Sequence, residues 1–305
     1  MPSLKILRNR INSVKSTQKI TSAMKMVAAA KLRRAQAQAE ASRPYAVRMA
    51  EMLSALAASE AGNPNGNKLL VGNGKSQTHL LVAVTADRGL AGGFNANIAK
   101  MMRQKAAALQ AEGKSVKIFA LGRKGNESLR RDMREQITGS KNFVGKKIIT
   151  FADAEEVAQE IIRGFKAGEY DVVTLMFNRF HNVMTQKPFE QPLIPAAQPS
   201  ANDNMRSEQT GQTAAQTAAM EHNYEVEPDD GTLLDRLLPR NLAVQIYAAL
   251  LENAAGFYAS QMTAMDSATR NAGQMIKKLT LSYNRARQAN ITRELIEIIS
   301  GAEAV

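Results

Sequence analysis

Residues 262–286 read MTAMDSATRNAGQMIKKLTLSYNRA, and this stretch decides the fold. Residues of one face recur in steps of three and four: Met262, Met265, Thr269, Ala272, Ile276, Leu279, Tyr283 and Ala286. A sustained average of about 3.5 residues per step is typical of the contact seam of a left-handed coiled coil. The stretch therefore predicts a long helix that winds around a second helix.

The N-terminal segment supplies the second helix. Ser3 is a suitable N-cap, and neither glycine nor proline occurs from there to Pro44. Pro44 is expected to kink the helix without ending it, because an apolar rhythm continues to Ala58. The predicted stripe consists of Leu4, Leu7, Ile11, Val14, Ile20, Met24 and Val27.

The two terminal helices are expected to pair antiparallel, since a compact middle domain returns the chain to the end of the first helix. If Met24 lies near Met265, Leu4 falls near Ala286, and nothing after about Asn290 has a partner within the chain. A lone helix that is apolar on most sides needs another protein to cover it. The uncovered tip carries Ile291, Leu295, Ile296, Ile298 and Ile299.

The middle of the chain alternates strand and helix patterns, which predicts an α/β domain of Rossmann-like type with a mostly parallel five-stranded sheet. Pro188 is expected to end the last strand at a sheet edge. The expected strands are 79–86, 116–121, 147–151, 171–177 and 182–187, and the expected helices are 94–111, 123–134 and 154–166.

Four regions follow from these patterns. Residues 1–60 form the N-terminal coiled-coil helix, 75–195 the α/β domain, 196–230 a linker and 231–305 the C-terminal coiled-coil helix. Within the linker, residues 198–219 are poor in large apolar side chains and predict a flexible insertion. Pro239 is expected at the start of the long final helix.

Composition limits the function. The chain of 305 residues has no cysteine, so it contains no disulfide, thiolate metal site or thiol switch. No run reaches the ~20 apolar residues of a membrane-spanning helix, so no direct membrane insertion is expected. The net charge is +12, and residues 1–43 contain ten basic residues against the single acid Glu40. This imbalance favours an acidic partner, which could be nucleic acid, anionic lipid or acidic protein loops, over a solvated helix face or a cleavable organelle presequence.

No catalytic constellation is visible. The turn Asp87–Gly93 follows a strand and precedes a helix, but it lacks the spacing of known phosphate-binding loops, so a structural turn is favoured over a nucleotide site. His79, His181 and His222 are far apart and predict neither a metal site nor a catalytic pair. We therefore expect no cofactor and no metal.

Three motifs resemble the gamma subunit of F-type ATP synthases. The first is RINSVKSTQKITSAMKMVAA at 10–29, the second DRGLAGGFN at 87–95, and the third YNRARQANIT at 283–292, which continues to IISG at 298–301. The likeness covers nearly the whole chain, and only 198–219 stands out as an insertion. One departure is Gln261, where the family commonly has arginine.

The resemblance implies a rotor shaft that couples rotation of the proton-driven c-ring to ATP synthesis or hydrolysis. The coiled coil would turn inside the alpha3beta3 hexamer, and the α/β domain would stand on the c-ring beside the epsilon subunit. ATP chemistry would belong to the beta subunits. The complex would lie at the cytoplasmic face of a bacterial inner membrane, or at the matrix side in a mitochondrion.

The resemblance also implies roles for individual residues. Met24, Lys25 and Gln261 would face acidic loops of the beta subunits, and Ile291, Leu295, Ile296, Ile298 and Ile299 would turn in a hydrophobic bearing. Rotor–stator catch contacts would come from Arg287, Gln288, Thr292, Glu294 and Glu297.

Two other functional classes remain. A basic helical hairpin could bind nucleic acid, although aromatic residues for base stacking are sparse and the apolar tip would have no role. An α/β enzyme with helical arms would require activity from the isolated chain.

Overall fold

The computed structural model describes residues 3–59, 67–146, 148–196 and 230–303. The predicted insertion 198–219 lies outside these residues. The chain divides into two compact units, and the division falls inside both long helices. The coil unit contains residues 1–31, 90–92 and 258–305, and the sheet unit contains 32–89 and 93–257.

Two long helices contribute to both units. Helix α1 spans Leu4–Ser59 and helix α8 spans Asp230–Glu303. Pro44 lies inside α1, as expected, and the helix continues past it. Pro239 also lies inside its helix, so the expectation that it starts the final helix is wrong: α8 begins at Asp230.

The sheet unit is built on five strands in the order β3-β2-β1-β4-β5. Strands β1 (Thr78–Val84), β2 (Ser115–Leu121), β3 (Ile137–Lys141) and β4 (Val172–Phe180) are parallel, and β5 (Gln186–Ile194) is antiparallel to β4. The predicted α/β architecture with a mostly parallel five-stranded sheet is confirmed.

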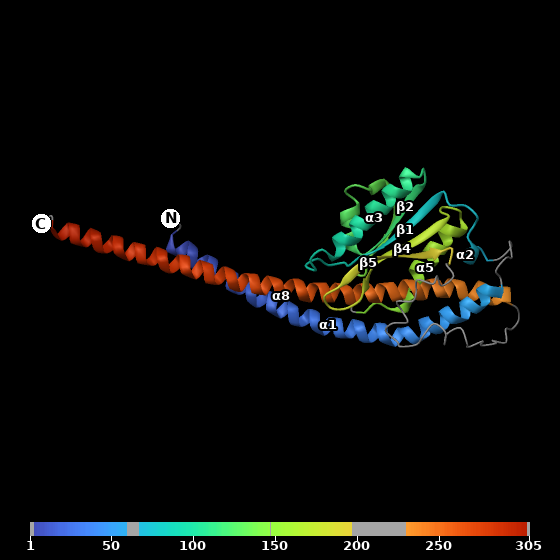
Figure 1. Cartoon of the computed structure of the whole chain (residues 1–305), viewed down its shortest axis with the longest axis horizontal. Helices are drawn as coiled ribbons and strands as arrows, with labels where there is room; N and C mark the ends of the chain where they lie inside the picture. Colours follow the sequence, from blue (N-terminus) through green and yellow to red (C-terminus); the bar gives the residue numbers. More distant parts are fainter. Residues whose placement is uncertain (1–2, 60–66, 147, 197–229, 304–305) are drawn as a thin grey trace. The chain divides into compact units, whose positions relative to one another are not determined.

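Both faces of the sheet are covered, which explains why β1 is apolar on both sides. Leu81 and Ala83 face α3 (Phe94–Ala111) and α4 (Arg123–Leu129). Leu80, Val82 and Val84 face the other way, toward α5 (Phe151–Lys166) and the sheet-unit segments of α1 and α8 (Figure 1). The other elements among the described residues are α2 (Lys68–Val71) and a 3₁₀ turn at Arg134–Gln136. Helix α4 therefore ends earlier than the predicted 123–134.

The third strand was predicted at the wrong place. Residues 148–150 are irregular and Phe151 begins α5, while the strand lies at Ile137–Lys141. The reason is a capping box, in which the Asp153 carboxylate accepts from the Thr150 backbone N–H at 2.9 Å. This bond makes Thr150 the N-cap of the helix that begins at Phe151.

The last strand was also misplaced. Residues 182–185 form the hairpin turn, where Asn182 Oδ1 accepts from the backbone N–H of Met184 at 2.9 Å and of Thr185 at 2.8 Å. Pro188 does not end the strand, because β5 is an edge strand and contains both Pro188 and Pro192. An edge strand tolerates residues without an N–H donor.

Asp171 joins the start of β4 to the start of β1, and its replacement tests the sheet unit. Its carboxylate accepts from the backbone N–H of Thr78 at 2.9 Å and of Gln77 at 3.0 Å, and from Asn73 Nδ2 at 2.6 Å. The bond from Thr78 is the main cause that holds the pKa of Asp171 below its ordinary value. We expect Asp171→Asn to lower the free energy of unfolding by about 2 kcal/mol at pH 7.

The pH dependence follows from the direction of that shift. Because the pKa of Asp171 is lower in the folded state than in the unfolded state, its contribution is present above the unfolded pKa. It is lost as the pH falls through the folded pKa. Urea unfolding at pH 7 and at about pH 3 should therefore show a difference between wild type and variant that shrinks at low pH. The control Asp132→Asn removes an exposed carboxylate paired with Arg103 and should change stability by less than about 0.5 kcal/mol.

Candidate functional site

Within the coil unit, α1 and α8 lie side by side and run antiparallel (Figure 1). Three contacts fix the pairing: Arg8 Nη2 donates to Tyr283 Oη at 3.0 Å, Thr269 Oγ1 to Thr21 Oγ1 at 2.7 Å, and Lys25 Nζ to Asp266 Oδ1 at 2.6 Å. The predicted alignment of Met24 with Met265 and of Leu4 with Ala286 agrees with these contacts.

The seam is buried largely as the heptad pattern predicts. The predicted positions Leu4, Ile11 and Val14 and those from Ile276 to Ala286 are half-buried. Ile20 and Val27 are exposed instead, because the buried face of α1 passes through their neighbours Thr21 and Ala28. Such a single contact line is the pattern of two paired helices. The buried residues of the seam are Leu7, Thr21, Ala28, Met265 and Ala272.

The C-terminal tip of α8 extends beyond the start of α1 (Figure 1). Every residue from Asn290 to Ser300 is exposed, in contrast to the seam before it. The exposed fractions of the aliphatic residues are 48% for Ile291, 53% for Leu295, 58% for Ile296, 67% for Ile298 and 58% for Ile299. Such a run of exposed aliphatic side chains on one helix is typical of a surface that another protein covers.

The five predicted catch residues are all exposed and lie on this same end of α8. By helical periodicity Arg287, Glu294 and Glu297 share one side, and Gln288 and Thr292 share another. The Thr292 hydroxyl donates back to the Gln288 carbonyl at 3.0 Å. The charged groups therefore border the aliphatic stripe of Ile291, Leu295 and Ile298.

The predicted beta-facing residues lie at the other end of the coil unit. Met24 and Gln261 are half-buried, and Lys25 is 46% exposed in its ion pair with Asp266. The hydrogen bond from Lys25 holds the pKa of the Asp266 carboxyl below its ordinary value. Asp266 was not identified from the sequence. Its position next to the seam residue Met265 and opposite a basic helix could have predicted the ion pair.

Positive charge on α1 is largely uncompensated inside the coil unit. Lys5, Arg10, Lys15 and Lys19 are exposed and have no ion pair among the residues that the structure describes. Lys31 lies over the ring of Tyr258, 5.6 Å from its centroid. Unpaired cations along one helix favour an acidic partner surface.

The turn that follows β1 is occupied by its own hydrogen bonds. Asp87 accepts from the backbone N–H of Arg123 at 2.9 Å and of Phe143 at 3.0 Å. Asn95 Oδ1 accepts from the Ala86 N–H at 2.9 Å, and its Nδ2 donates to the Arg88 carbonyl at 3.2 Å. These side chains hold neighbouring loops together, which supports the structural interpretation of the motif over the nucleotide site.

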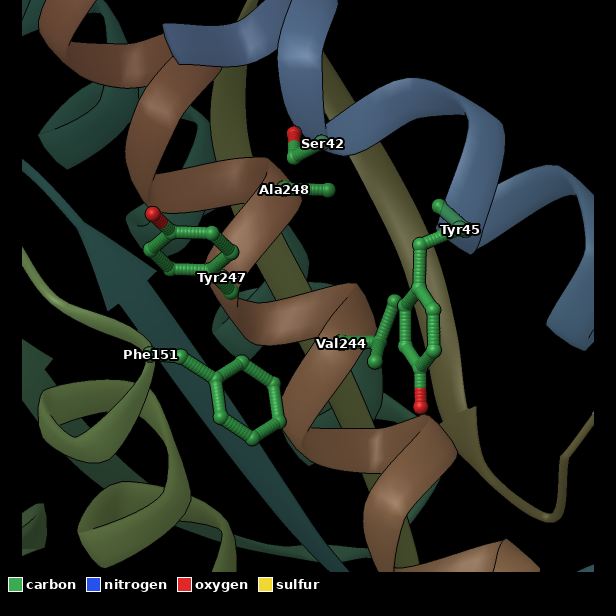
Figure 2. Close-up of a pocket in the computed structure, with 7 residues that line it drawn as sticks. Ser42, Tyr45, Phe151, Val244, Tyr247 and Ala248 are labelled. Atoms are coloured by element: carbon green, nitrogen blue, oxygen red, sulfur yellow. The ribbon is translucent and has the colours of Figure 1, made fainter.

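An apolar hollow of about 80 Å³ lies between α1, α5 and α8 in the sheet unit (Figure 2). Its walls carry no charged side chain, and the Tyr247 hydroxyl accepts from Gln38 Nε2 at 2.9 Å. The arrangement offers no acid, base or nucleophile for catalysis. The lining residues are Ser42, Tyr45, Ala46, Phe151, Val244, Tyr247 and Ala248.

Across residues 3–59, 67–146, 148–196 and 230–303, no group of three or more histidine or acidic side chains could hold a metal ion. Among the helices of that part of the chain, none has an apolar stretch that could span a bilayer. The exposed tip and the basic coil are therefore the strongest candidate functional surfaces.

The chain is similar to known proteins along almost its whole length. A family model described as ATP synthase matches residues 3–305. An ATP synthase gamma chain from Acidiphilium cryptum is 67% identical over 306 aligned residues that cover 100% of both chains.

Two solved structures extend the comparison. A chain of the Tetrahymena thermophila mitochondrial ATP synthase central stalk and c-ring has a TM-score of 0.59 at 26% identity, covering 82% of this chain and 99% of that one. A chain of the Euglena gracilis mitochondrial ATP synthase OSCP/F1/c-ring has a TM-score of 0.66 at 17% identity, covering 99% and 94%, and shows the same fold. The nucleic-acid-binding alternative is not supported by these matches. Matched along its full length by these relatives, the chain belongs to the ATP synthase gamma-chain family.

Proposed function

We propose that this chain is the rotating shaft of an F-type ATP synthase, with its coil unit inside an alpha3beta3 head and its sheet unit joined to the c-ring and the epsilon subunit. The observation that carries the proposal is the exposed aliphatic tip of α8, which has no partner within the described chain. The similar solved chains support it, because they come from ATP synthase assemblies that contain a central stalk, F1 and a c-ring.

The tip has two kinds of contact surface. Ile291, Leu295 and Ile298 form a stripe that can turn in an apolar bearing, where no directional bond resists rotation. Arg287 and Glu294 lie beside that stripe and can form charge-assisted hydrogen bonds with a stator at particular angles. Rotation would then alternate between angles with and without these contacts.

Coupling follows if the stator subunits differ in conformation according to the side of the shaft they face. A shaft can shift their nucleotide affinity only through contacts that differ between their states. The two helices of the coil differ in charge, because residues 4–31 of α1 carry basic residues and no acidic ones, whereas the coil-unit part of α8 carries both signs. On this proposal the beta subunits carry out the ATP chemistry, and this chain contributes no reacting group.

Met24→Lys tests the contact at the base of the coil. A cation at this half-buried position, next to Lys25, would add an attachment to an acidic loop of a beta subunit. We expect assembly to be preserved and proton pumping per ATP hydrolysed to fall by about twofold or more, since an extra ion pair of up to ~1 kcal/mol resists rotation. The measurement is ATP-driven acidification of membrane vesicles divided by ATPase rate. Met24→Leu is the matched control, and equal pumping ratios for both variants would count against the contact.

The proposal as a whole is tested by purifying the untreated complex through a tag on this chain. We expect alpha, beta and epsilon subunits and the c-ring to co-purify from detergent-solubilised membranes, with the complex attached to the cytoplasmic face of a bacterial inner membrane. ATP hydrolysis should appear with the complex and not with the isolated chain. Isolation of the chain from membranes without alpha and beta subunits would overturn the proposal.

A further inference from the structure

The seam of the coil unit has two different halves. Toward the start of α1 it is aliphatic and aromatic, and the register set by Arg8–Tyr283 and Thr21–Thr269 places Leu7, Ile11 and Val14 opposite Tyr283, Leu279 and Ile276. Toward the other end it is small and polar. There Gln18, Thr21 and Lys25 face Gly273, Thr269 and Asp266.

A hydrogen bond crosses the seam in the polar half. The Thr269 hydroxyl donates to Thr21 Oγ1 at 2.7 Å, and the Thr21 hydroxyl donates to the Gln18 carbonyl of its own helix at 3.1 Å. Thr21 is buried, and the Met265 carbonyl lies 2.8 Å from the Thr269 hydroxyl as its alternative acceptor. The hydrogen bond between the two hydroxyls exists only while these residues face each other across the seam; in a slipped register each hydroxyl could only turn back to a carbonyl of its own helix.

Two further contacts demand the same alignment. Gln18 lies against Gly273, where a Cβ would come within 3.2 Å of Gln18 Nε2. Lys25 pairs with Asp266, whose second oxygen lies 3.1 Å from Arg270 Nη2. Across these pairs the α8 residue number falls as the α1 number rises, as one antiparallel register requires.

The aliphatic layers of the other half do not impose a register in this way, and the cross-helix hydrogen bond of that half, from Arg8 Nη2 to Tyr283 Oη at 3.0 Å, is exposed. If the helices slipped by one turn, Val14 would still meet an aliphatic or small side chain, because Leu279 and Ala272 flank Ile276 in the seam. The same slip would move Gln18 from Gly273 to Ile276 or Thr269 and separate the two threonines. Packing of apolar layers is tolerant, whereas polar side chains in a coiled-coil seam specify register.

We propose that the Thr21–Thr269 hydrogen bond, with the Gln18–Gly273 and Lys25–Asp266 contacts beside it, is a register lock for the coil. The lock sets how far the tip of α8 extends beyond the start of α1. A slip of one turn would displace the tip by about 5.4 Å. If the proposed function holds, Thr21 and Thr269 are thus positioning residues for the catch contacts of Arg287 and Glu294 at the tip.

The natural absence of cysteine allows a direct test in the full-length isolated chain. Val14→Cys/Ile276→Cys reports the native register, and Val14→Cys/Leu279→Cys reports a slip of one turn. Cα atoms more than about 7 Å apart do not form a disulfide without backbone movement. In the natural background we expect oxidation of the native pair to be faster than that of the slipped pair by about tenfold or more.

The lock is removed by Thr21→Val/Thr269→Val, which keeps the side-chain volume and deletes both hydroxyls. We expect this double variant to stay folded, with the ratio of native to slipped disulfide formation falling by about threefold or more. Thr21→Ser/Thr269→Ser keeps the hydroxyls and should retain the natural ratio. Helix content by circular dichroism verifies folding of each variant.

Unchanged selectivity in the valine variant would overturn the lock and show that packing elsewhere along the two helices sets the register. Equal loss in the valine and serine variants would also overturn it, because the effect would then follow packing and not the hydrogen bond. Neither outcome concerns the partners of the chain, so failure here is separate from failure of the proposed function.

Discussion

Gly122→Ala is expected to destabilise the sheet unit by at least about 3 kcal/mol, a large part of the roughly 5–15 kcal/mol that holds a typical domain folded. Gly122 has a φ of 96° and connects β2 to α4. A Cβ there would lie 2.1 Å from the carbonyl oxygen of Thr85, a distance that no rotamer can relieve. The neighbouring loop cannot retreat easily, since Thr85 Oγ1 accepts from the Gly125 N–H at 2.9 Å.

The measurement is urea-induced unfolding followed by circular dichroism. Gly168→Ala is the matched control, because Gly168 also has a positive φ of 75°, but a Cβ added there would meet no other atom within 4 Å. The control should lose only the conformational cost of about 1–2 kcal/mol. Similar unfolding midpoints for the two variants would contradict the steric explanation.

Leu295→Glu/Ile298→Glu is expected to leave the isolated chain unchanged and to reduce ATPase activity of the assembled complex by about tenfold or more. Both side chains are more than half exposed, so carboxylates at these positions remain in water in the isolated chain. In an apolar bearing the same carboxylates would have to lose their hydration, which is costly for unpaired charges.

The experiment compares thermal unfolding of the isolated variant with subunit content and ATPase rate of the complex. Met184→Glu is the control, since Met184 is an exposed methionine at the β4–β5 turn, far along the chain from the tip. It adds one negative charge and should alter neither quantity. Normal ATPase activity in a fully assembled complex that carries both tip substitutions would refute the bearing.

The sequence was most informative where a repeating pattern extends over many residues. The step of three and four from Met262 to Ala286 predicted the seam, because each extra heptad repeats the same physical requirement. The compact middle domain then predicted the antiparallel pairing, and with it the uncovered tip. The apolar run of β1 likewise predicted a strand covered on both faces.

Short elements were harder, because local hydrogen bonds decide them. The capping box of Thr150 and Asp153 turned a predicted strand into a helix start, and β3 contains Gly139 and few apolar residues. Polar contacts across the coil, such as Lys25–Asp266, depend on the rotamers of the two side chains. They do not recur at a fixed spacing, so the sequence pattern does not predict them. The roles of the predicted catch and bearing residues remain predictions, since they depend on surfaces that other chains supply.

Rotation itself is the most direct test of the account. In the natural cysteine-free background, Met184→Cys gives the sheet unit a single attachment point for an optical probe. With the alpha3beta3 head fixed to a surface and ATP added, we expect stepwise rotation of the probe in one direction. A probe that stays at one angle while the same complexes hydrolyse ATP would contradict it.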